Sequence, residues 1–171
     1  MMIWWAMMAC SGNNEDSGTA MPDWQPMVRT DAWILTDAGD DPFPDRPDTV
    51  DCSELGLQVE GAAFEVSTVD CPYATLRQPL LVDVPAGTEI EIVLWHLDLW
   101  AEEAAMGHIA VGHDDGVLYE AQVEIPAGAE VYPITASAEW DMVAGEWMYF
   151  HVHNHGYNSW SLGSVEAFTL P

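Results

Sequence analysis

Apolar and polar residues alternate with a period of two along most of the chain after residue 52. Within 117–125, Val117, Tyr119 and Val123 fall on one face while Glu120 and Glu124 fall on the other, which is typical of a half-buried antiparallel strand. The same pattern predicts strands near residues 55–60, 62–68, 79–84, 88–99, 107–112, 117–125, 130–138, 146–154 and 159–169. About eight or nine short strands separated by Pro- and Gly-containing turns predict an all-β fold, an antiparallel β-sandwich of jelly-roll type.

The pattern is different in residues 11–51, which carry ten acidic residues, two arginines and several prolines. Such a composition favours an extended or disordered segment. We therefore predict an acidic, Pro-rich tether over 11–51 and one β-sandwich domain over 52–171. Trp24 and the run from Trp33 to Leu35 are apolar exceptions, which we expect to dock on the domain as one short strand.

Residues 1–10 form an apolar run that ends in Ala9-Cys10 and is followed by small and polar residues. This arrangement resembles the export signal of bacterial lipoproteins, and the resemblance implies lipidation of Cys10. Ser11 directly after the cysteine is similar to the signal for sorting to the outer membrane. The expected location is extracytoplasmic, at the outer membrane or cell surface, with a lipid anchor as the membrane contact, since the run is too short for a helical span of about 20 residues. The alternative is an N-terminal core strand with a buried free cysteine.

Removing Cys10 leaves two cysteines, Cys52 and Cys71. In an exported domain an even pair is most simply a disulfide. A Cys-Cys metal pair is the alternative, although no further ligand lies near either residue in the sequence.

Charge excludes several classes of partner. The chain has 29 acidic residues and three basic ones, for a formal net charge of −26. Nucleic acid and anionic lipid are therefore repelled, because binding them requires a cationic surface. A Gly-rich phosphate loop is also missing from the sequence.

All six histidines fall between positions 96 and 155, and three of them lie at alternate positions of one predicted strand: His151, His153 and His155. Two residues at i and i+2 on a strand point the same way with Cα atoms about 7 Å apart. Their imidazoles can reach one ion, as zinc and copper sites require. His96 and Asp98 form a second i, i+2 pair, and we expect it to complete the site if the two segments face each other across the sandwich.

Two metal-free alternatives remain open. Histidines near a turn also serve as structural hydrogen-bonding residues at a strand edge. The same segment is rich in aromatic and amide side chains that can stack on sugar rings and bind hydroxyls. The candidates for such a glycan- or protein-binding surface are Trp147, Tyr149, Asn154, Tyr157, Asn158 and Trp160.

Residues 144–154, together with Ser159-Trp160-Ser161-Leu162, resemble the last strand pair of bacterial secreted β-sandwich modules. Pre-peptidase C-terminal domains and some carbohydrate-binding modules share this shape. Neither a Gly-x-Ser-x-Gly elbow nor a His-Glu-x-x-His zinc helix occurs. We predict an exported binding module, with zinc or copper as ligand or a glycan or protein as the alternative. An enzyme in which a strand-borne metal activates water is the less favoured hypothesis.

Overall fold

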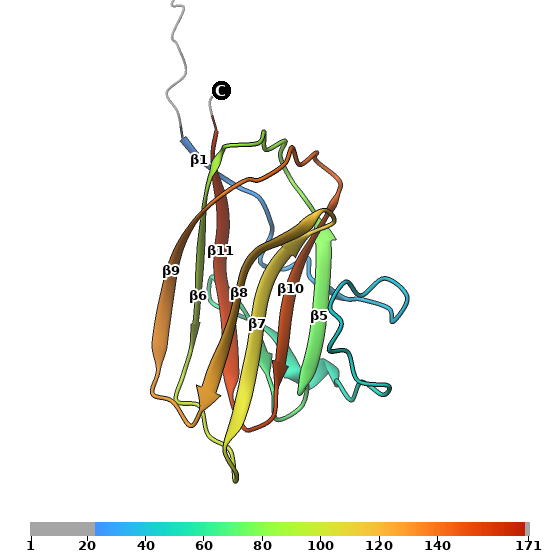
Figure 1. Cartoon of the computed structure of the whole chain (residues 1–171), viewed down its shortest axis with the longest axis vertical. Coiled ribbons are helices and arrows are strands. Elements are labelled where there is room, and N and C mark those ends of the chain that lie inside the picture. The colour runs from blue at the N-terminus through green and yellow to red at the C-terminus, as the bar shows by residue number, and fades with distance from the viewer. Residues whose placement is uncertain (1–22, 170–171) are drawn as a thin grey trace, which may run out of the picture.

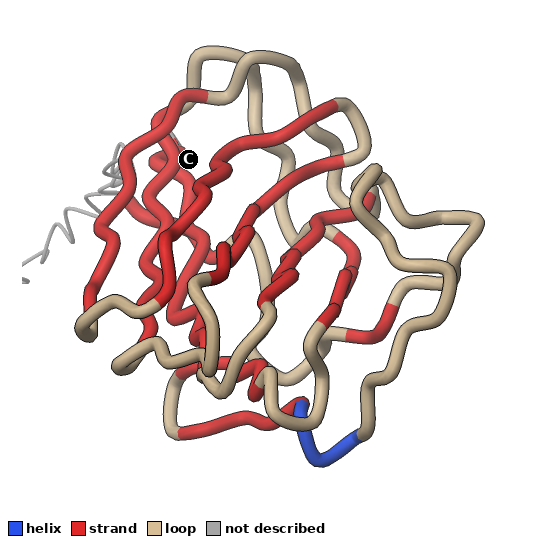
Figure 2. Tube along the Cα trace, turned by 60° about the horizontal axis from the view of Figure 1, so that its bottom comes forward, coloured by secondary structure: helices blue, strands red, loops and turns tan. Residues whose placement is uncertain are grey.

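Two antiparallel β-sheets pack face to face in the computed structural model, which describes residues 23–169 (Figure 1). The first sheet consists, in spatial order, of β3 (Leu57–Glu60), β4 (Ala63–Ser67), β11 (Ser159–Thr169), β6 (Glu89–His96) and β9 (Glu130–Ser137), with β1 (Asp23–Pro26) also paired to β11. The second consists of β2 (Ile34–Leu35), β5 (Tyr73–Pro79), β10 (Trp147–Asn154), β7 (Ala105–His113) and β8 (Gly116–Ile125). One short 3-10 helix, η1 (Glu54–Gly56), is the helical element of the described residues (Figure 2).

The path of the chain between the sheets is that of a jelly roll. From β4 to β7 each strand lies in the sheet opposite the one before it, and the chain alternates again from β8 to β11. The central strands β10 and β11 are each paired on both sides. Two interlocked Greek keys with this order are the jelly-roll arrangement, so the predicted fold class is confirmed.

The core lies between the sheets and follows the period-two pattern. On β10, Met148, Phe150 and Val152 are fully buried in the main apolar cluster. Successive residues of a strand point to opposite faces, so His151 and His153 point away from this core. The histidines therefore lie on the outer face of the second sheet.

One strand is placed differently from its prediction. The apolar run 79–84 predicts a strand, but the observed strand β5 ends at Pro79. Proline lacks the N–H that a ladder needs, and Pro79 and Pro85 bracket the run. Leu80 and Val84 instead fill the end of the core as the chain crosses between the sheets.

Residues 23–51 lie against the sandwich, although the sequence places them in an acidic tether. β1 pairs with β11 and β2 pairs with β5, so the segment joins both sheets. Met27 and Trp33 are buried in the main core, because burial of apolar side chains stabilises the folded state whatever the composition of the surrounding sequence. Residues 1–22, which include Cys10, the predicted signal at 1–10 and the start of the tether, lie outside the described residues.

Cys52 and Cys71 form the predicted disulfide, with 19 residues of sequence separation. Cys52 lies just before η1, and Cys71 lies two residues before Tyr73, the first residue of β5. In the described part of the chain, no helix is long and apolar enough to cross a membrane.

Candidate functional site

The outer face of the second sheet brings histidines from two strands together. His153 on β10 lies opposite His108 on β7, and His151 on β10 lies opposite Thr75 on β5. β7 points Ile109 into the core, so its neighbour His108 points outward. Strand register, rather than sequence proximity, thus sets His108 beside the histidines of β10.

A loop covers this face and supplies a carboxylate. We call residues 36–48 the covering loop; it follows β2 and runs past β5 (Figure 1). Phe43 of the loop stacks on the imidazole of His151, with ring centroids 4.1 Å apart. Within the loop, Nη1 of Arg46 donates to Oδ2 of Asp41 at 2.6 Å. These contacts hold the loop on the sheet and place Asp45 over the histidines.

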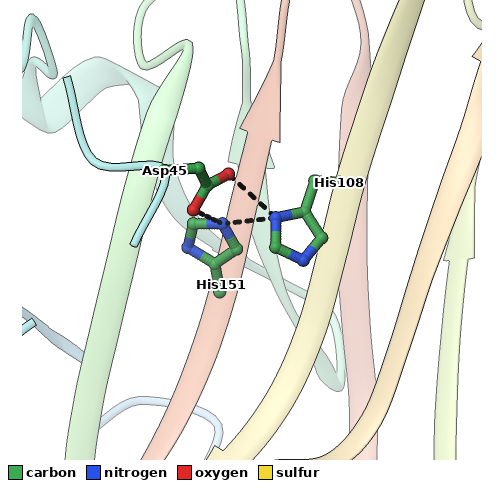
Figure 3. A group of neighbouring side chains, drawn as sticks. All are labelled: Asp45, His108 and His151. Carbon is green, nitrogen blue, oxygen red and sulfur yellow. Dashed lines mark hydrogen bonds and ion pairs between the residues drawn. The ribbon is translucent and has the colours of Figure 1, made fainter. Parts of the chain in front are cut away.

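Asp45, His108 and His151 converge on one point, as Figure 3 shows. Oδ2 of Asp45 lies 2.9 Å from Nδ1 of His108, and Oδ1 of Asp45 lies 3.5 Å from Nε2 of His151. The two imidazole nitrogens are 3.2 Å apart. His153 joins the group through Asp45, because its Nδ1 lies 2.8 Å from Oδ2 of that carboxylate.

A chain of hydrogen bonds fixes the tautomer of His151. Asp41, as a carboxylate, accepts the hydroxyl proton of Tyr73 at 2.9 Å. Thr75 must then donate its own proton to the Tyr73 oxygen, 3.2 Å away. Because the Thr75 hydroxyl has no second proton, the 2.9 Å contact with His151 must be donated by Nδ1–H of the ring. Nε2 of His151 is therefore left with a lone pair that faces His108 and Asp45.

His108 is oriented in the same manner from the other side. Its Nε2 lies 2.8 Å from Oε1 of Glu120 on β8, and a carboxylate can only accept. Nε2 therefore carries a proton. In neutral His108 the lone pair belongs to Nδ1, the nitrogen that faces Asp45 and His151. Two imidazole lone pairs and a carboxylate then meet with no proton between them.

Burial and hydrogen bonding shift the protonation of this group. The neighbouring imidazoles, that of His151 first and then those of His108 and His153, hold the pKa of Asp45 far below its usual range against the opposing effect of burial. Burial lowers the pKa of His151 below 6.5, although Asp45 opposes this. The cluster thus favours an ionised carboxylate beside a neutral His151 imidazole, the protonation states of metal ligands.

The structure brings together some of the predicted metal ligands and not others. His151 and His153 share the face as predicted, whereas His155 is exposed and contacts the ring of His153 at 4.8 Å between centroids. His96 lies on β6 in the other sheet and faces the interior, where Nε2 meets the hydroxyl of Tyr132. Asp98 accepts a backbone N–H from Ala129 in the same region. His96 and Asp98 are therefore not part of the cluster, because the outward face of one sheet does not meet the inward face of the other.

Sequence reasoning missed Asp45 and His108. For His108 a signal was present, since it alternates with Ile109 and Val111 on a predicted strand. For Asp45 the signal is weaker and lies in Phe43, a large apolar residue between two prolines in a polar segment. An isolated aromatic of this kind indicates a loop that docks on an apolar surface.

The predicted aromatic and amide surface is largely buried. Trp160 is 0% exposed and packs in the main core. Nδ2 of buried Asn154 donates to the hydroxyl of Thr68, and Oδ1 of buried Asn158 accepts the backbone N–H of Trp100. Tyr149 lies under the covering loop and forms a small apolar cluster with Phe43 of that loop. Trp147, half-buried, lies against the guanidinium of Arg77. Only Tyr157 of the six predicted residues is exposed.

Comparisons with known proteins show likeness in fold. No family model matches the chain, and no curated protein matches it. Among solved structures, the chain is similar to a CBM4 protein, with 12% identity, a TM-score of 0.41 and coverage of 64% of this chain and 82% of that chain. It is also similar to the enzymatically active domain of tailspike protein 4 of bacteriophage CBA120, with 15% identity, a TM-score of 0.37 and coverage of 85% of this chain and 19% of that chain. A third similar structure is PfGH50B, with 10% identity, a TM-score of 0.36 and coverage of 67% of this chain and 21% of that chain.

This chain thus spans about a fifth of the length of the last two structures. At such identities the likeness concerns the β-sandwich alone. Fold and site together define a disulfide-closed jelly-roll module with a His/Asp cluster on one outer face. The function is argued below from the cluster itself.

Proposed function

We propose that the protein binds a divalent transition metal, zinc or copper(II), through Nε2 of His151, Nδ1 of His108 and the carboxylate of Asp45. The observation that carries the proposal is the 3.2 Å approach of the two imidazole nitrogens beside an ionised carboxylate. Ligand atoms around a tetrahedral zinc, with Zn–N bonds of about 2.1 Å, lie about 3.4 Å from one another. The two imidazole nitrogens are 3.2 Å apart, and each lies at a similar distance from one oxygen of the carboxylate: 2.9 Å from Nδ1 of His108 to Oδ2 and 3.5 Å from Nε2 of His151 to Oδ1.

The same position can be taken by a proton. Without metal, a second proton on His108 lets Nδ1–H donate to Asp45 while Nε2–H donates to Glu120. That network leaves Oδ1 of Asp45 buried without a hydrogen-bond partner, which costs free energy. A cation between the three ligand atoms would satisfy this oxygen, so metal and proton compete for the site.

The donor set selects the class of metal. Imidazole nitrogens favour zinc, copper, nickel or iron over calcium and magnesium, which prefer oxygen ligands. His153, whose Nδ1 contacts Asp45, is the candidate for a further ligand or for a residue that orients the carboxylate. Glu120 and Thr75 would hold the far nitrogens of the two rings, as partners of metal-ligating histidines commonly do.

The proposed setting is the cell exterior. The Ala9-Cys10 sequence supports a lipid anchor, and the Cys52–Cys71 disulfide is in keeping with an oxidising compartment. In this setting we propose that the module binds metal and does not catalyse a reaction. Glycan binding, the second candidate function, has a different surface and is argued in the next subsection.

The test is metal content of the full-length chain, purified without chelator or histidine tag and measured by plasma mass spectrometry after reconstitution with zinc or copper. We expect about one bound equivalent, lost in a His108→Ala/His151→Ala double variant. His155→Ala is the matched control, because it removes an exposed histidine of the same segment and should keep the metal. No bound metal in the folded wild type, or equal binding by the double variant, would contradict the proposal.

A further inference from the structure

Two large aromatic side chains are exposed at one end of the sandwich. Trp100 is 51% exposed and Tyr157 is 55% exposed, and their rings stack with centroids 5.4 Å apart and planes 22° apart. They come from the β6–β7 and β10–β11 connections, which meet at the lower end of Figure 1. Half-exposed rings contribute little to the core, so their position calls for another role.

The pair is held rigidly by buried groups. The backbones of Trp100 and Tyr157 form a β-bridge, in which the Tyr157 N–H donates to the Trp100 carbonyl at 3.0 Å. The Trp100 N–H donates to Oδ1 of Asn158 at 2.6 Å, and Asn158 is 5% exposed. The backbone N–H of Asn158 donates in turn to the hydroxyl of Thr68, which is also buried. A rigid aromatic surface loses little entropy on binding a ligand.

Gly156 makes this arrangement possible. A Cβ atom at this position would lie 2.5 Å from the carbonyl oxygen of Trp100 and 2.9 Å from Nδ2 of Asn158. Both neighbours belong to the buried scaffold of the aromatic pair. The two loops can therefore approach closely only because residue 156 has no side chain.

Tyr157 lines two hollows with polar rims. A cavity of about 690 Å³ is lined by Tyr157 together with Glu102, Glu103 and His155. A second of about 230 Å³ is lined by Tyr157 together with Asp98. An apolar surface beside a few hydrogen-bonding groups is the composition of a small-molecule site.

Charge restricts the ligand. The three arginines of the chain are each ion-paired elsewhere: Arg29 with Asp31, Arg46 with Asp41 and Arg77 with Asp40. The rim of the hollows is acidic, so phosphates, uronates and other anions are disfavoured. Carboxylates accept hydrogen bonds from hydroxyls, while aromatic faces pack against the C–H groups of a sugar ring.

We propose that the Trp100–Tyr157 pair is a binding platform for neutral, hydroxyl-rich polysaccharide, which stacks on the rings while Glu102 and Asp98 accept hydrogen bonds from its hydroxyls. This site is separate from the His/Asp cluster and does not depend on a metal. Trp100 was not among the residues predicted from the sequence.

The test is isothermal titration of the full-length chain with cellohexaose, laminarihexaose, xylohexaose and mannohexaose. We expect at least one of these neutral oligosaccharides to bind with a Kd below about 1 mM. Trp100→Ala and Tyr157→Ala should each weaken binding about tenfold or more, the loss typical of truncating an aromatic anchor. Trp24→Ala is the matched control, since Trp24 pairs with Phe168 away from these two loops and its removal should leave the affinity unchanged.

Three results would overturn the proposal: no binding of any of the four oligosaccharides, affinity unchanged in both aromatic variants, or a concentration-dependent dimer in sedimentation that Trp100→Ala abolishes. The last result would assign the surface to a second copy of the chain. Repeating the titration with EDTA and with His151→Ala separates this proposal from metal binding. Retained affinity in both supports an independent site, and loss in both would show that the ligand requires the metal cluster instead.

Discussion

Nε2 of His151 and Nδ1 of His108 lie 3.2 Å apart, and the hydrogen bonds on the far side of each ring already use the proton that a neutral imidazole carries. Thr75 accepts a hydrogen bond from Nδ1–H of His151, and Glu120 accepts one from Nε2–H of His108. Thr75 and Glu120 thus influence whether a proton or a metal ion binds between the two rings, although neither residue contacts that position. This arrangement makes the outer partners the first targets for mutation.

Replacing Glu120 with alanine should weaken metal binding about 10- to 100-fold, the usual cost of losing the partner of a metal-ligating histidine. Without the carboxylate, His108 loses the acceptor that keeps its proton on Nε2. Competition titration against a chromophoric chelator measures the change. Glu124→Ala is a suitable control, because Glu124 is exposed on the same strand, four residues from Glu120, and is opposite Met106 on β7. Equal losses in the two variants would indicate a general charge effect and not a specific partner.

Removing the metal should loosen the covering loop. Asp45 is the loop residue whose carboxylate meets the imidazole nitrogens, and a shared cation would tie it to both strands. We expect faster hydrogen exchange in residues 36–48 after chelation, with little change in β6 and β9 of the other sheet. Mass spectrometry of peptic fragments reports this difference. Asp45→Asn, measured with metal present, should reproduce the faster exchange; identical exchange with and without metal would mean that Phe43 and Arg46 alone hold the loop.

The metal-free protein should lose stability as the pH falls below about 6.5. Burial lowers the pKa of His151 in the folded state below the value of 6.5 for a free side chain. The unfolded chain therefore takes up this proton first, so the contribution of His151 to stability is complete above pH 6.5 and declines as the pH falls toward the folded pKa. One proton changes the free energy of unfolding by at most about 1.4 kcal/mol per pH unit.

Urea unfolding in EDTA between pH 8 and pH 5 measures this slope. His151→Asn, which retains a donor toward Thr75, should show a shallower dependence. Asp45, whose pKa is also lowered, contributes in the same direction but near and below its ordinary value of 3.8, outside this range. A variant with the same slope as the wild type would assign the pH dependence to other groups.

Most of the strands follow from local alternation of apolar and polar residues in the sequence. Met148, Phe150 and Val152 alternate with His151 and His153, and this pattern alone sets the inward and outward faces of β10. Sheet pairing is not encoded so locally. Whether His151 meets His108 or His96 depends on which strands are neighbours, and this is decided by the whole jelly-roll path.

The contribution of the covering loop to the site could not be predicted from the sequence, and the reason is physical. Asp45 is one of 29 acidic residues, and nothing in its immediate neighbours distinguishes a carboxylate over a histidine pair from a solvated one. Its role depends on where Phe43 packs, which is a tertiary contact. Composition described the segment correctly as acidic and Pro-rich, but it did not determine that residues 23–51 lie on the sandwich.

The Cys52–Cys71 disulfide should stabilise the domain and also support the cluster. It closes a loop with 19 residues of separation, for which loss of chain entropy in the unfolded state predicts about 3 kcal/mol of stabilisation. Cys71 is fully buried and lies two residues before Tyr73, whose hydroxyl joins Asp41 to Thr75. Cys52→Ser/Cys71→Ala should therefore lower the free energy of unfolding by about 3 kcal/mol and weaken metal binding as well. Chemical denaturation and metal titration of the same variant measure the two effects. If stability falls while metal affinity is unchanged, the disulfide acts on the unfolded chain alone, and the position of Tyr73 is maintained by its pairing in the second sheet.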